Sequence, residues 1–258
     1  MKIAVLSDIH GNLVALEAVL KDLARQGTVA QIIVAGDFFA PGPETKRILE
    51  ALQDLPGVRF LRGNADRYLL DGSYTAVYSG EGWQRRLREA FRWTDERLGP
   101  RERRFLAALP FSYLLELSRW PLLAVHGSPR SDEEGLTPDT SAERLEQMSI
   151  PSHVGLISCG HTHVPMDRLI NGVRVVNCGS VGLPFDGDNR AGYALFSNLD
   201  AKTPEFVSVE LRRVEYNIEQ AIKTLYAVKH PAADMGAYNL RHGRPQGTLN
   251  IYKINDAQ

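Results

Sequence analysis

An acid and an imidazole stand together near the start of the chain, directly after a short apolar run. Ile3–Leu6 is typical of a buried strand, and Asp8 and His10 follow it. Side chains two residues apart in extended backbone point the same way, so these two groups can meet at one point. Such a pair of oxygen and nitrogen ligands suits a divalent transition metal. For these two residues alone, an Asp helix cap followed by a surface histidine is the alternative.

The same arrangement recurs in four later segments. Strand-like runs over 31–35, 58–61, 122–125 and 154–158 each end in polar residues beside a glycine, which permits close backbone approach. Ligands bind at the carboxyl ends of strands in open α/β sheets, so the side chains that follow these strands are expected to converge. The full set is Asp8, His10, Asp37, Asn64, His126, His161 and His163.

Seven oxygen and nitrogen ligands exceed what one zinc ion with an open position takes. They suit two divalent ions that share a bridging carboxylate, about 3.5–4 Å apart. The set holds no thiolate, which disfavours a closed structural zinc site. His153, His230 and His242 lie outside the set and are expected at the surface or in the tail.

Composition and charge fit an α/β domain of ordinary size. The chain has 258 residues, and 43% of them are hydrophobic, which is enough for a full core. The formal net charge is −1, so no global field attracts nucleic acid or an anionic membrane. Cys159 and Cys178 make no disulfide framework, and the N-terminus resembles neither a signal peptide nor a membrane span. A cytoplasmic location is therefore expected.

Alternating strands and helices must position the seven side chains. Helices predicted over 13–23 and 45–52 connect the first three strands, which indicates a mostly parallel sheet with right-handed crossovers. Asn171-Gly172 between two apolar runs predicts a tight hairpin. A short helix is expected over 141–148. The remaining predicted strands cover 111–117, 168–170, 173–176, 192–196 and 206–214.

A helical insertion is predicted over about 67–109. Eight arginines lie between Arg85 and Arg104, against four acids. One interpretation is a solvated amphipathic surface, and the other is a basic wall beside an anionic substrate. The C-terminal part, about 215–258, is predicted as one helix over 217–228 and a tail with a strand-like run at 249–254. No linker divides the chain, so residues 1–258 are predicted to form one domain.

Five motifs, taken in order, resemble those of the calcineurin-like metallophosphoesterases. The motifs are Asp8-Ile-His10, Gly36-Asp37, Gly63-Asn64, His126-Gly127 and Gly160-His161-Thr-His163. Order, spacing and strand context agree with the family from residue 1 to about 200, and the compact prokaryotic phosphodiesterases are the most similar members. The resemblance implies an α/β fold, a two-sheet sandwich flanked by helices in α/β/β/α layers.

The resemblance also implies a role for each motif residue. It assigns the first metal to Asp8, His10 and His163, the second to Asn64, His126 and His161, and the bridge to Asp37. It assigns catalysis to Asp37, Asn64 and His126, and substrate binding to Asn12, Asn64 and Gly127. Asn12 is equally well placed to cap the following helix. The two ions are drawn from Mn²⁺, Fe, Zn²⁺, Co²⁺ and Ni²⁺, which the sequence does not rank.

One position departs from the family. Ala65 stands in Gly63-Asn64-Ala65-Asp66, where relatives have Gly-Asn-His-Asp or Gly-Asn-His-Glu, and that histidine helps to protonate the leaving group. The metal ligands are retained and the general acid is not, so efficient hydrolysis of esters with poor leaving groups is not expected. Asp66 is a candidate to orient a ligand.

The expected function is hydrolysis of a small phosphodiester or nucleotide-like phosphoester, dinucleoside polyphosphates included, by a metal-bridging hydroxide. Stable nucleic-acid or membrane binding is not expected, and a homo-oligomer is left open. The alternative is a catalytically weak scaffold on the same fold, because the retromer scaffold subunit also resembles this family. A Ser/Thr protein phosphatase is a third hypothesis, which Ala65 and the small size disfavour.

Overall fold

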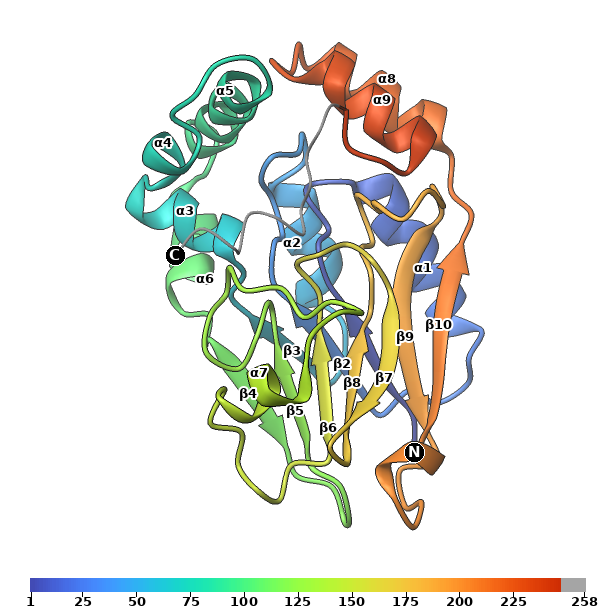
Figure 1. Cartoon of the computed structure of the whole chain (residues 1–258). Helices are drawn as coiled ribbons and strands as arrows, with labels where there is room; N and C mark the ends of the chain where they lie inside the picture. Colours follow the sequence, from blue (N-terminus) through green and yellow to red (C-terminus); the bar gives the residue numbers. More distant parts are fainter. Residues whose placement is uncertain (247–258) are drawn as a thin grey trace.

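Two five-stranded sheets pack face to face, and helices lie on their outer faces (Figure 1). The structure is a computed structural model, and it describes residues 1–246. The predicted α/β sandwich is confirmed. The predicted strand-like run at 249–254 lies outside the described residues. No helix within residues 1–246 is long and apolar enough to cross a membrane.

The first sheet has the strand order β10-β9-β1-β2-β3. Its strands are β1 Ile3–Leu6, β2 Gln31–Ala35, β3 Val58–Leu61, β9 Ala191–Ser197 and β10 Ser208–Val214. As predicted, β1, β2 and β3 run parallel, whereas β9 is antiparallel to both β1 and β10. The three parallel strands therefore end at the same edge.

The second sheet has the order β4-β5-β6-β8-β7. Its strands are β4 Ser112–Leu115, β5 Leu122–Val125, β6 Leu156–Cys159, β7 Met166–Ile170 and β8 Val173–Asn177. The strands β5, β6 and β8 are parallel. The predicted hairpin joins β7 to β8, and Asn171 and Gly172 both have positive φ, 48° and 79°, as a two-residue turn of this kind requires.

Alternation along the strands divides the interior into layers. In β1, Ile3 and Val5 face the second sheet, where they share a core with Leu122 and Leu156. The intervening residues, Ala4 and Leu6, belong to a different core cluster. That cluster also holds buried residues of helices α1 (Leu13–Ala24) and α2 (Lys46–Gln53). The short helix α7 (Ala142–Glu146) packs on the outer side of the second sheet.

Two further groups of helices lie beyond the strand ends (Figure 1). The segment predicted as helical contains α3 Asn64–Asp71, α4 Tyr74–Val77, α5 Trp83–Asp95 and α6 Pro100–Ala107. The C-terminal group contains α8 Ile218–Ala227 and α9 Ala233–His242, and a short 3₁₀ turn, Pro204–Phe206, precedes β10. The sequence predicted α8, but α9 lies where only an irregular tail was expected, and that expectation is wrong.

A partly buried ion pair attaches α1 to the sheet. Asp22 accepts hydrogen bonds from the guanidinium of Arg212 on β10, at 2.9 and 3.1 Å, and from the hydroxyl of Tyr193 on β9, at 2.6 Å. Hydrogen bonding to Arg212 lowers the pKa of Asp22 from its ordinary value of 3.8. The pair holds the helix that directly follows Asp8 and His10, the first of the predicted ligands.

We expect Asp22→Asn to reduce the free energy of unfolding at pH 7 by ~1 kcal/mol, because the carboxylate is only partly shielded from solvent. The folded-state pKa is lowered, so the stabilisation is present above pH 3.8 and is lost as the pH falls through the folded-state pKa. Urea unfolding of both forms between pH 7 and pH 2.5 measures the difference. A loss that does not shrink in acid, or an equal loss in the exposed control Asp54→Asn, would contradict this account.

Candidate metal centre

Five of the seven predicted ligands have backbone in the left-handed region. The φ angles are 57° at Asp8, 47° at His10, 58° at Asp37, 64° at His161 and 58° at His163. Residues other than glycine rarely adopt this conformation, and each instance costs about 1–3 kcal/mol unless its surroundings hold it. The strain lies at strand ends and aims side chains inward, which is typical of a functional site.

One group of candidate ligand atoms comes from the first and the last of the five motifs. The Oδ1 atom of Asp8 lies 3.1 Å from Nε2 of His163 and 3.7 Å from Nε2 of His10. The two Nε2 atoms are themselves 3.1 Å apart. These three residues form one candidate metal-binding group.

A second group lies next to the first. Nε2 of His126 is 3.5 Å from Oδ2 of Asp37 and 4.0 Å from Oδ1 of Asp8, and these three form the other candidate group. Oδ1 of Asn64 lies between Nε2 of His126, at 2.9 Å, and Nδ1 of His161, at 3.0 Å. The fold thus brings all seven predicted ligands into one region.

Both buried carboxylates border the two groups. Oδ2 of Asp37 lies 3.8 Å from Nε2 of His10 and 3.5 Å from Nε2 of His126, so it faces one histidine of each. Oδ1 of Asp8 has the same double placement. The bridging role that the resemblance gives to Asp37 fits this geometry and stays a prediction. The position of Asp8 fits a bridging role equally well.

The histidine rings are oriented by backbone carbonyls. Nδ1 of His10, His126 and His163 donates to the carbonyl oxygens of Ala40, Ala35 and Leu183, respectively. A neutral ring that donates through Nδ1 presents a lone pair at Nε2. Such outer hydrogen bonds are the usual way in which proteins fix a metal-binding histidine.

One carboxylate oxygen among these candidate ligands is left without a hydrogen bond. Oδ1 of Asp8 is fully buried and has no hydrogen-bond partner among the described residues. It lies 3.7 Å from Nε2 of His10 and 3.1 Å from Nε2 of His163. A buried carboxylate oxygen in such surroundings is costly unless a cation compensates it. Oxygen and imidazole donors suit divalent transition metals, so these residues fit the metal ions that the sequence predicted.

Charge in the centre favours cations. Burial alone would raise the pKa of Asp8, but the imidazoles of His163 and His126 outweigh it and hold this pKa well below 3.8. Burial likewise opposes a charge on His10, and the carboxylates of Asp8 and Asp37 overcome it and raise the pKa to about 9. His161 differs, because burial and the neighbouring His126 lower its pKa to about 3. The two acids thus dominate the field of the centre.

Asp66 holds the backbone around the bridging candidate. Its Oδ2 accepts from the N–H groups of Asp37, at 2.8 Å, and Gly63, at 2.9 Å, and its Oδ1 accepts from Phe38 at 3.1 Å. Asp66 is completely buried. Asp66 contacts backbone N–H groups and no candidate-ligand side chain, and its orienting role stays a prediction.

Two predicted substrate residues make other contacts. Asn12 caps α1, since its Oδ1 accepts from the N–H of Ala15 at 3.1 Å, while its Nδ2 donates to the carbonyl of Gly182 at 3.0 Å. The cap alternative for Asn12 is thus realised, and its contact with substrate stays a prediction. The backbone of Gly127 packs closely on the loop at 131–134, and its substrate role also stays a prediction.

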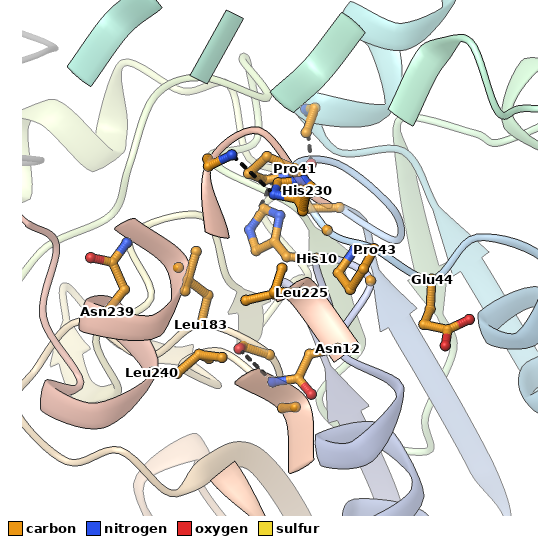
Figure 2. A pocket seen from close by; sticks show the side chains of 18 of the residues that line it. His10, Asn12, Pro41, Pro43, Glu44, Leu183, Leu225, His230, Asn239 and Leu240 are labelled. Atoms are coloured by element: carbon orange, nitrogen blue, oxygen red, sulfur yellow. Dashed lines mark hydrogen bonds and ion pairs between the residues drawn. The ribbon is translucent and has the colours of Figure 1, made fainter. Parts of the chain in front are cut away.

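A cavity of about 450 Å³ opens from the centre and extends between the two helix groups (Figure 2). The helix α5 contributes Leu87 and Phe91 to its lining, and none of the eight arginines at 85–104 lines it. The basic wall is therefore absent here, and the amphipathic interpretation of this helix holds. His230 lines the cavity and is only 5% exposed, so its predicted surface position is wrong. His153 and His242 are exposed, as predicted.

Comparison with known proteins decides the family. The model of the calcineurin-like phosphoesterase superfamily domain matches residues 1–201. The chain belongs to this superfamily. Its predicted family membership and its predicted fold are thereby confirmed, and phosphoester hydrolysis is the activity for which the superfamily is named.

Individual relatives of this phosphoesterase-family chain cover nearly all of it. An uncharacterized protein of Methanocaldococcus jannaschii is 29% identical over 246 residues, which are 89% of this chain and 93% of the relative. A metallophosphoesterase structure from Sphaerobacter thermophilus is 29% identical, with a TM-score of 0.73, and covers 94% of this chain and 100% of its own. A hypothetical protein from Pyrococcus horikoshii OT3, 24% identical with a TM-score of 0.79, covers 95% and 99% and shows the same fold.

We expect Asp66→Asn to weaken metal binding by about 10- to 100-fold, as is typical when a group that supports a ligand is replaced. The amide would turn an N–H group toward the backbone donors that the carboxylate now satisfies. Calorimetric titration of the metal-free protein with Mn²⁺ measures the affinity. Asp71→Asn, at the exposed end of the same helix, is the matched control. Unchanged affinity in Asp66→Asn would show that the centre does not depend on this carboxylate.

Proposed function

We propose that this chain is a metal-dependent phosphoric ester hydrolase that acts on phosphodiesters or nucleotide-like phosphoesters through two divalent ions. The observation that carries the proposal is the buried Oδ1 of Asp8, which has no hydrogen-bond partner among the described residues and lies among imidazole Nε2 atoms. The remaining ligand candidates surround it within one region. A closed structural site would not need seven such groups beside an open cavity.

The ligand roles follow the resemblance and fit the distances. Asp8, His10 and His163 would hold one ion, and Asn64, His126 and His161 the other, with Asp37 between them. Bound ions of this kind polarise phosphoryl oxygens and lower the pKa of water toward neutrality. Asn64 lines the cavity, where it would orient a phosphoryl group, and His126 is buried behind it with Nε2 2.9 Å from Oδ1 of Asn64. The buried carboxylates keep the centre anionic and hold the cations in place.

Ala65 defines a limit of the proposed activity. Its backbone N–H donates to Oδ1 of Asp37 at 2.9 Å, and its methyl group lines the cavity beside Asn64. No imidazole therefore reaches a leaving group from this position. Hydrolysis should be fastest for esters whose leaving groups depart without a proton.

We expect the fully loaded protein to bind two ions per chain and to hydrolyse an aryl phosphodiester. Asp37→Ala should lower the occupancy of both ions, because its carboxylate faces both groups, whereas His163→Ala should lower mainly one. Elemental analysis gives the ion count, and a panel of aryl monoesters, aryl diesters, cyclic nucleotides and dinucleoside polyphosphates ranked by kcat/KM gives the activity. One ion or none would contradict the dinuclear proposal, and metal without any hydrolysis would favour a scaffold.

We expect Ala65→His to raise turnover of alkyl esters more than that of nitrophenyl esters, because general acid catalysis contributes about 10²–10⁴-fold. The gain should fall short of this range, since the new imidazole also needs a partner to orient it. Measurement of kcat across a leaving-group series in both forms gives the slope against leaving-group pKa. Equal slopes would show that some other group already supplies the proton.

A further inference from the structure

The cavity beyond the centre has two apolar walls. Leu87 and Phe91 of α5 lie on one side, and Leu225 of α8 with Met235 and Leu240 of α9 lie on the other. Figure 2 shows Leu225 and Leu240 near Leu183 and His10, so the apolar surface begins at the metal ligands. A volume of about 450 Å³ lies in the range of small-molecule sites.

The charged side chains at this cavity disfavour a second phosphate. Within residues 1–246, Arg47 is the only lysine or arginine that lines it. The guanidinium of Arg47 already lies 3.2 Å from the carboxylate of Glu44 and 3.8 Å from that of Glu17. These two acids and Glu133 also line the cavity, so its charged lining is acidic on balance. A polyphosphate chain would meet repulsion here.

His230 supplies one polar group in this apolar setting. Its Nδ1 accepts from the N–H of Ala232 at 3.3 Å, so the ring proton is on Nε2. That Nε2 is buried and has no hydrogen-bond partner among the described residues. The ring packs edge-on against Trp93, with centroids 5.0 Å apart, and burial together with Arg97 lowers its pKa to about 4. His230 is thus a neutral ring that adds no charge to the cavity, and its buried Nε2–H is not exposed to a ligand there.

We propose that this cavity binds an uncharged, largely apolar group of the substrate. The inference rests on the proposed phosphoesterase function and narrows its substrate. The substrate class is a phosphoester with a single phosphoryl group attached to an aryl or similar apolar moiety. Dinucleoside polyphosphates, with their chain of charged phosphates, fall outside it.

Binding of phosphonates tests the cavity without any hydrolysis. Methylphosphonate, butylphosphonate, phenylphosphonate and 4-carboxyphenylphosphonate share one head group for the metals and differ in the group that enters the cavity. Calorimetry with the metal-loaded protein should give Kd values for phenylphosphonate about 10- to 100-fold lower than for methylphosphonate, with a negative heat-capacity change. The carboxylate form should bind more weakly than the phenyl form. Equal affinities, or tighter binding of the carboxylate form, would overturn the inference.

This outcome is separable from the proposed function. If the protein binds phenylphosphonate selectively but hydrolyses no ester, the inference about the cavity is supported and the proposed hydrolase function is contradicted. If the protein hydrolyses aryl and methyl esters alike and binds all four phosphonates equally, the hydrolase function is supported and the inference about the cavity is contradicted.

Variants test the apolar wall. Leu225→Ala should reduce the ratio of phenyl to methyl affinity by at least about 10-fold, whereas Val228→Ala, at the exposed position directly after the same helix, should leave it unchanged. A ratio that is unchanged in Leu225→Ala would overturn the role of this wall. Thermal unfolding checks each variant, and the wild-type ligand series decides the case if one does not fold.

Discussion

The structure is organised around two carboxylates that are removed from water, Asp8 and Asp37. They are 0% and 3% exposed, and a buried charge is tolerated only with hydrogen bonds and opposite charge around it. Backbone groups meet half of that need, because Oδ2 of Asp8 accepts from the N–H of His161, and Oδ1 of Asp37 accepts from that of Ala65. The Asp8–His161 bond joins loops of the two sheets, and the Asp37–Ala65 bond joins the segments that follow two strands of the first sheet. The other two oxygens, Oδ1 of Asp8 and Oδ2 of Asp37, face imidazole rings, and cations bound there would offset their charge.

The same requirement accounts for the tight backbone at the strand ends. A Cβ atom at Gly63 would lie 2.1 Å from Oδ1 of Asp37, and one at Gly160 would lie 2.4 Å from Oδ2 of Asp8. Glycine at these two positions is what lets the backbone donors approach the carboxylates. The left-handed conformations at Asp8 and Asp37 belong to the same arrangement, in which local strain is offset by packing and hydrogen bonds elsewhere.

The convergence of the seven candidate ligands could be predicted from the sequence because each directly follows one of five parallel strands, and such strands end at one edge. The hairpin at Asn171-Gly172 was equally local, since two residues determine the turn. The helix α9 was not predicted, because Gly236 lies in its interior and its place depends on packing against Leu225 of α8. The burial of His230, and the cavity itself, follow from that long-range packing and have no local signal.

The candidate metal ligands and the helices that form one apolar wall of the cavity lie in different parts of the chain. The superfamily domain ends at residue 201, and the ligand candidates all precede that point, whereas α8 and α9 follow it. Asn12 connects the two parts. Its amide caps α1 beside the first ligand motif and also donates to the hydroxyl of Tyr216, at 3.4 Å, directly before α8. The side chain that follows the first candidate-ligand motif thus contacts the segment that leads into α8, and Asn12 also lines the cavity between them.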